Sequence, residues 1–253
     1  MKKIIYLIAI TAFFACTSDN SSKKRLEQSV ILTEYTNTRV QNFEESLIKS
    51  LATNTDIEQF KKSLKENLLS KDEPLMVDLE KKMSKYNRAK STYNPEVDTV
   101  LIVKMNELKN SIITFTPNES DDNEIIKQEF ISHLNNEKTK FIDTISKQND
   151  LTEIQKEILT SQAIYEVGVI SVLSKYSEKL EQLNNVQKTK TGQQKATNGC
   201  NWWCQNKKAI VCSGISLGAA GCWVGVIYGC EPCINYCIAL TISAVTCWGW
   251  QTW

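Results

Sequence analysis

The sequence predicts a mainly α protein, with a helical-bundle body followed by a small disulfide-rich module that folds as a helical hairpin. Three observations support this. Apolar residues recur at three- and four-residue steps between residues 25 and 185, which is the spacing of one helix face. Helix-capping and helix-breaking residues separate these stretches. Third, the C-terminal segment 200–253 holds eight of the nine cysteines and all six tryptophans, and it has only three charged residues.

Four regions follow from these patterns: a signal peptide with its lipobox cysteine (1–16), the helical body (17–185), a flexible linker (186–199) and the cysteine-rich module (200–253). The signal peptide begins with a basic stretch and continues with an apolar run, Ile4 to Ala15. This run is shorter than the roughly 20 apolar residues that span a bilayer, so it predicts export.

The end of the apolar run, Phe13-Phe14-Ala15-Cys16, resembles a bacterial lipobox with bulky residues at its two variable places. The resemblance implies a lipid on Cys16 and a lipid-anchored location in the bacterial cell envelope. A plain secreted protein and a signal anchor are the alternatives. Removing Cys16 from the nine cysteines leaves eight, an even number that suits an oxidised exported protein.

The helices of the body are predicted from their apolar stripes. In chain order the stripes are Val40, Phe43, Leu47 and Leu51; Ile57, Phe60 and Leu64; Leu79, Met83 and Tyr86; Val97, Leu101, Met105, Leu108, Ile112 and Phe115; and Ile126, Phe130, Leu134, Phe141 and Ile145.

Helix ends are expected at Pro74, at Ser91 to Pro95 and at Pro117. Capping boxes are expected at Thr55 to Glu58 and at Thr152 to Gln155. The longest helix is expected to begin at the second box, either as the central strut of a bundle or as a coiled-coil arm. The bundle is favoured because the apolar repeat slips near Gly168. This helix carries the apolar residues Ile154, Ile158, Tyr165, Val169, Leu173, Tyr176, Leu180 and Leu183.

Several functional classes are disfavoured. Residues 16–198 carry 26 Lys and Arg against 28 Asp and Glu, so the body offers no basic nucleic-acid surface. No phosphate-binding loop, metal-binding histidine pair or nucleophile elbow is present, and the one histidine, His133, is expected to be a surface or packing residue. The acidic stretch Glu119 to Glu124 lacks the spacing of a calcium loop and is expected to be a solvated turn before a helix. We therefore expect no enzyme, cofactor or metal site.

The module contains two uncharged runs, Ala209 to Gly229 and Ile234 to Trp253, with a bend at Pro232. Their glycines lower helix stability in water, so crosslinks or a bilayer are needed for order. Export favours disulfides over a zinc site. Four bridges leave 105 pairings open. The predicted disulfide cysteines are Cys200, Cys204, Cys212, Cys222, Cys230, Cys233, Cys237 and Cys247.

Tryptophan favours the bilayer interface, although it also serves as core in small disulfide proteins. The predicted membrane-contact residues are Trp202, Trp203, Trp223, Trp248, Trp250 and Trp253. The segments Cys200 to Cys204 and Ser213 to Cys222, with the count of eight cysteines, resemble the maturing end of cysteine-rich bacteriocin precursors of the halocin-like and fulvocin-related kinds. This resemblance covers about 55 of 253 residues and implies a secreted peptide that acts on bacterial membranes.

The expected function is therefore that of an exported bacteriocin-like precursor, whose helical body escorts or masks a membrane-active C-terminal module. Its expected partners are the membrane and the body itself, and the module is either released outside the cell or retained. The alternative is a lipid-anchored surface protein whose tail is a non-enzymatic binding or assembly module.

Overall fold

The computed structural model of the chain describes residues 2–84, 99–118, 122–183 and 203, with the backbone alone for the first 26. The described part is a helical bundle without strands, which confirms the mainly α class. The predicted hairpin of the module lies outside the described residues. The helices are α1 (Lys2–Thr53), α2 (Ile57–Ser84), α3 (Thr99–Ile113), α4 (Asn123–Lys147) and α5 (Glu153–Lys175).

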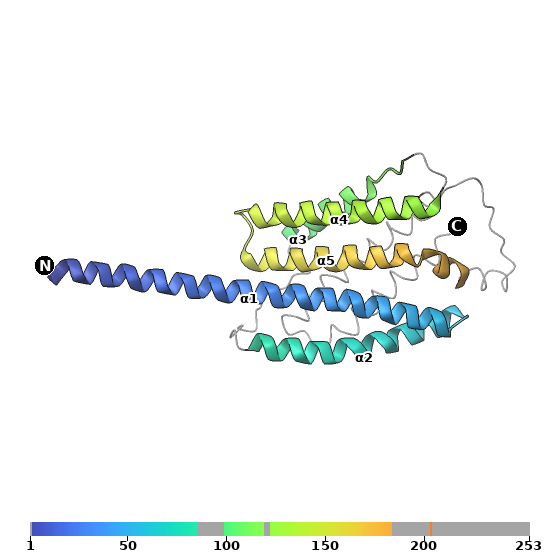
Figure 1. Cartoon of the computed structure of the whole chain (residues 1–253), viewed down its shortest axis with the longest axis horizontal. Coiled ribbons are helices and arrows are strands. Elements are labelled where there is room, and N and C mark those ends of the chain that lie inside the picture. The colour runs from blue at the N-terminus through green and yellow to red at the C-terminus, as the bar shows by residue number, and fades with distance from the viewer. Residues whose placement is uncertain (1, 85–98, 119–121, 184–202, 204–253) are drawn as a thin grey trace.

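Figure 1 shows α2, α1, α5 and α4 side by side, and α3 packs on α4 and α5. After Tyr176 the chain turns and continues as a short helix over 177–183. The N-terminal part of α1 projects beyond the bundle, and the predicted signal peptide, with Cys16, forms the first turns of this helix. Within the described ranges, no helix combines the length and the apolar character needed to cross a membrane.

Where the structure describes side chains, the core follows the predicted stripes; Met83, Tyr86 and Val97 lie outside that part. Phe43, Phe60, Phe130 and Leu134 are fully buried, and Val40, Leu51, Met105 and Tyr176 pack against the same cluster. One predicted core residue is wrong: Ile154 lies in the first turn of α5 and is 39% exposed. The prediction that the helix starting at Thr152 is the longest is also wrong, because α5 has 23 residues whereas α1 has 52.

The capping boxes have different outcomes. At α5 the prediction is confirmed, since the Thr152 hydroxyl accepts from the Gln155 amide and the Gln155 side chain accepts from the Thr152 amide. At α2 the predicted Thr55 box is wrong. Asp56 caps this helix through Oδ1, which accepts from the amides of Glu58 at 2.9 Å and Gln59 at 3.2 Å. The Asp56 carbonyl also accepts the first bond of the helix, from Phe60, so the cap lies one residue later.

Pro74 does not end a helix, which corrects the prediction of a break there. It lies inside α2 on the exposed side. Asp72 and Leu79, on either side of it, are both buried, with exposed fractions of 1% and 4%. Packing on both sides of the proline therefore holds the helix together across the hydrogen bond that proline cannot donate.

The contact that holds Asp72 is a buried ion pair. Its Oδ2 lies 3.2 Å from Nη2 of Arg39 in α1, and its Oδ1 accepts from Asn42 at 3.4 Å. The Arg39 guanidinium lies 4.6 Å from the ring centroid of Tyr165 in α5. Nearby, burial raises the pKa of Tyr35 to about 12. Because breaking a buried ion pair leaves an uncompensated charge, this cluster fixes how α1, α2 and α5 align.

The helices α1 and α5 approach most closely at Gly168, where the predicted apolar repeat slips. A Cβ atom at this position would lie 2.6 and 2.7 Å from the two methyl groups of Val40. Real Cβ atoms do not approach other atoms so closely. The absence of a side chain at Gly168 therefore allows α1 to lie against α5.

We predict that Gly168→Ala lowers the free energy of unfolding by about 1–3 kcal/mol, the usual effect of overpacking. Helix propensity alone would change stability by up to about 1 kcal/mol in the opposite direction. The double variant Gly168→Ala with Val40→Ala should recover part of the loss, which a double-mutant cycle from urea denaturation would measure. A Gly168→Ala protein as stable as the wild type would contradict the close approach.

Candidate functional site

The candidate site lies where the body meets Trp203 of the cysteine-rich module. Trp203 is the one module residue that the structure describes, and it is buried, with 7% exposed. Its ring lies edge-on to Phe115, with centroids 4.9 Å apart, and 5.1 Å from Phe130. Phe115 also lies 5.2 Å from Phe130 and 5.4 Å from His133. We call Phe115, Phe130 and His133 the aromatic socket.

Two helices position the aromatic socket. Phe115 follows the end of α3, and its amide donates to the Ile112 carbonyl at 3.3 Å, which turns the chain inward. Phe130 and His133 are three residues apart on α4 and so share one face. Nε2 of His133 lies 3.1 Å from the Ser111 carbonyl oxygen, which joins α3 to α4. His133 is thus a packing residue of the socket.

A groove of about 830 Å³ adjoins the socket and shares Phe115 and His133 with it. We call it the polar groove. Its other lining comes from α4 and from the segment after α3, and it includes the carboxylates of Glu124 and Glu129 but no lysine or arginine. The Glu129 carboxylate accepts from the Asn118 side chain at 2.7 Å and from the Asn118 amide at 3.2 Å. The groove is therefore open, polar and acidic.

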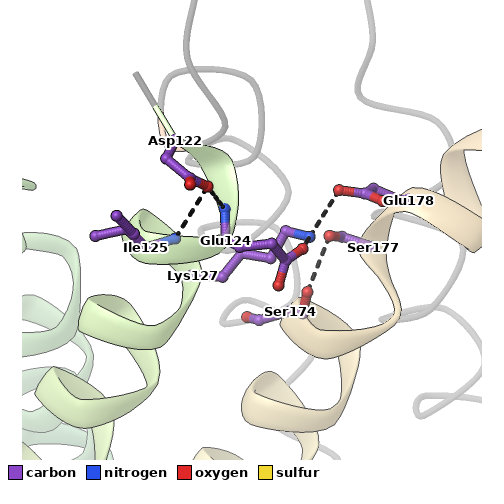
Figure 2. A network of polar contacts seen from close by, with 7 residues as sticks. All are labelled: Asp122, Glu124, Ile125, Lys127, Ser174, Ser177 and Glu178. Carbon is purple, nitrogen blue, oxygen red and sulfur yellow. Dashed lines mark hydrogen bonds and ion pairs between the residues drawn. The ribbon is translucent and has the colours of Figure 1, made fainter. Parts of the chain in front are cut away.

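Lys127, which pairs with Glu124 of the groove lining, joins α4 to the last described segment of the body (Figure 2). Its ammonium group binds Glu124 and lies 2.7 Å from Oε1 of Glu178. Burial lowers the pKa of Lys127, but the hydrogen bonds to Glu124 and Glu178 outweigh it and raise the pKa above its usual value. Asp122 caps α4 by accepting from the Glu124 and Ile125 amides. This network fixes the segment 177–183 against α4.

The other predicted site residues remain untested. The side chain of Cys16 and the positions of Cys200, Cys204, Cys212, Cys222, Cys230, Cys233, Cys237, Cys247, Trp202, Trp223, Trp248, Trp250 and Trp253 lie outside the described residues. So do the linker 186–199 and most of the acidic turn before α4. Among the described residues, no cluster of histidine, cysteine, aspartate and glutamate could hold a metal ion.

Sequence reasoning missed the aromatic socket. Phe115 and Phe130 were assigned to the stripes of two helices, as ordinary core. Their spacing gives no sign that Trp203, far later in the chain, packs against both. The sole signal in the sequence is that Phe115 closes its stripe just before Pro117, at a helix end where a further side chain finds room.

A second unusual group, Glu166, lies in the middle of α5 with 1% exposed. Burial raises the pKa of Glu166 well above the usual value for a glutamate, although the charge of Lys109 lowers it. Glu166 lines neither the polar groove nor the smaller cavity beside Leu51 and Leu183. It is a core carboxyl group, and burial favours its neutral form.

The raised pKa of Glu166 has a consequence for stability. The folded chain keeps the proton where the unfolded chain has lost it, so the free energy of unfolding falls as pH rises from about 4.5 through the folded pKa. We predict that Glu166→Gln removes this fall and makes the protein more stable than wild type at pH 8, by an amount of the order of 1 kcal/mol. Denaturation curves at pH 4.5 and pH 8 would check this; a wild type equally stable at both would contradict it.

Comparison of the chain with models of protein families, with curated protein sequences and with solved structures gives no match. The function must therefore be argued from the site itself.

We predict that Trp203→Ala destabilises the body by about 3–5 kcal/mol, the range for removing a buried tryptophan from a core. Trp203→Phe should lose less, because the smaller ring keeps the contacts with Phe115 and Phe130. Thermal unfolding followed by far-ultraviolet circular dichroism reports on the helical body and would measure both. Unchanged melting of Trp203→Ala would show that the body does not hold the module at this residue.

Proposed function

We propose that the chain is an exported bacteriocin-like precursor, anchored by a lipid on Cys16, whose helical body holds a membrane-active module. One observation carries the proposal. Trp203, one of the six tryptophans of the module, is buried against Phe115 and Phe130 of the body. A tryptophan that would favour the bilayer interface is thus withheld from it while the body holds the module.

The membrane activity is argued from the composition of the module. Residues 200–253 carry Lys207, Lys208 and Glu231 as their charged side chains, so moving the two uncharged runs into lipid carries a small desolvation penalty. Four disulfides would keep the apolar faces presented instead of collapsed. Lys207 and Lys208, just before the first run, would hold its end at anionic headgroups.

A lipid-anchored binding protein is the second candidate. It is favoured by the same contact, because a module that is never released would also be fixed to the body at Trp203. In that protein the apolar runs bind a partner or the body and do not enter a bilayer.

We predict that residues 199–253, oxidised and freed from the body, release dye from vesicles of bacterial lipid composition at micromolar concentration. Reduction of the disulfides should weaken or abolish the release, since the module would no longer hold one shape. The full chain, in which Trp203 is buried, serves as the matched control and should release less dye. A monomeric oxidised module that releases none would support the binding protein instead.

A further inference from the structure

We infer that the polar groove is a docking site for the segment that directly follows Trp203, residues 204–208, and that its carboxylates receive Lys207 and Lys208. The inference rests on the proposed function in one respect, because this segment opens the module that the body is proposed to hold. Docking in the groove would add an electrostatic contact between the module and the body to the aromatic contact of Trp203.

The position of the groove supports this occupant. Trp203 packs on Phe115, and Phe115 and His133 line the groove, so the chain after Trp203 begins at its edge. Lys207 lies four residues further on, and an extended chain of this length reaches roughly 13 Å. Within the described part of the chain, no segment fills the groove, which is open to solvent.

The charges are complementary. Lys207 and Lys208 are the only cations of residues 200–253. The groove is lined by Glu124 and Glu129 and by no lysine or arginine, while the ammonium group of Lys127, which is not part of the lining, binds Glu124. Each carboxylate accepts up to about four hydrogen bonds, so those made with Lys127 and with Asn118 leave acceptor sites for a lysine. The neutral polar lining also suits the intervening Gln205 and Asn206.

Docking of this segment has a direct consequence for the proposed activity. Lys207 and Lys208 are the side chains that would bind anionic headgroups. While they pair with Glu124 and Glu129 they are withheld from lipid, as Trp203 is. The polar groove and the aromatic socket thus mask the membrane-binding groups of one segment together.

The inference predicts slow chemical modification of these two lysines in the intact, oxidised chain. A limiting amount of an amine-acylating reagent, followed by mass spectrometry, gives the modification rate at each lysine. We expect Lys207 and Lys208 to react at least about three-fold more slowly than the linker lysines Lys188 and Lys190. Only the neutral amine reacts, and pairing with a carboxylate favours the protonated ammonium. Protection should fall between 50 and 500 mM salt, through screening of the groove charges.

The double variant Glu124→Gln with Glu129→Gln should raise the rates at Lys207 and Lys208 to those of the linker lysines. It retains an oxygen acceptor at both positions, so the Asn118 contacts can persist. The matched control is Glu58→Gln with Glu153→Gln. Both of these carboxylates lie on other helices and pair with a lysine three residues on, as Glu124 does. The control has the same net charge and should leave the protection unchanged.

Two results would overturn the inference. One is equal reactivity of Lys207 and Lys190 in the wild type. The other is protection that persists in the Glu124→Gln, Glu129→Gln protein with an unchanged melting temperature, which would place the lysines elsewhere. Neither result bears on dye release by the isolated module, so failure of this inference and failure of the proposed function are separable.

Discussion

Helix α5 is buried around its circumference, and this requirement determines where the other helices lie. Its buried residues include runs of neighbours, such as 161–163 and 165–167, which point in all directions around a helix. One partner helix covers one stripe, so α5 needs several. The helices α1, α4 and α3 all pack on it, and α2 reaches it through the Arg39 cluster on α1.

Covering α5 completely also encloses polar groups. Burial raises the pKa of Glu166, and Oε1 of Gln162, one turn earlier, has no hydrogen-bond partner among the described residues. Just after the end of α5, the ion pair between Lys127 and Glu178 holds the segment 177–183 against α4. Trp203 enters the core between Phe115 and Phe130, on the same part of α4. The segment 177–183 and Trp203 therefore both pack near the first half of α4, which is where the candidate site forms.

Local patterns could be predicted from the sequence, and long-range ones could not. The stripes of Phe43, Phe60 and Phe130 and the box at Thr152 depend on residues within one or two turns, so periodicity and capping rules suffice for them. Pro74 was misassigned because packing against α1, which is a tertiary effect, holds the helix across it. The aromatic socket joins residues from α3, α4 and the module, and the burial of Trp203 depends on where the fold places a helix end. Residue spacing carries no information about that place.

The approach of α1 and α5 at Gly168 has a consequence for how such sequences can diverge. Val40 and Gly168 share one space, so a larger residue at 168 is acceptable only together with a smaller one at 40. The two positions are 128 residues apart in the chain and should nevertheless vary together. A paired exchange that keeps the combined volume at the two positions would therefore preserve the packing of α1 on α5.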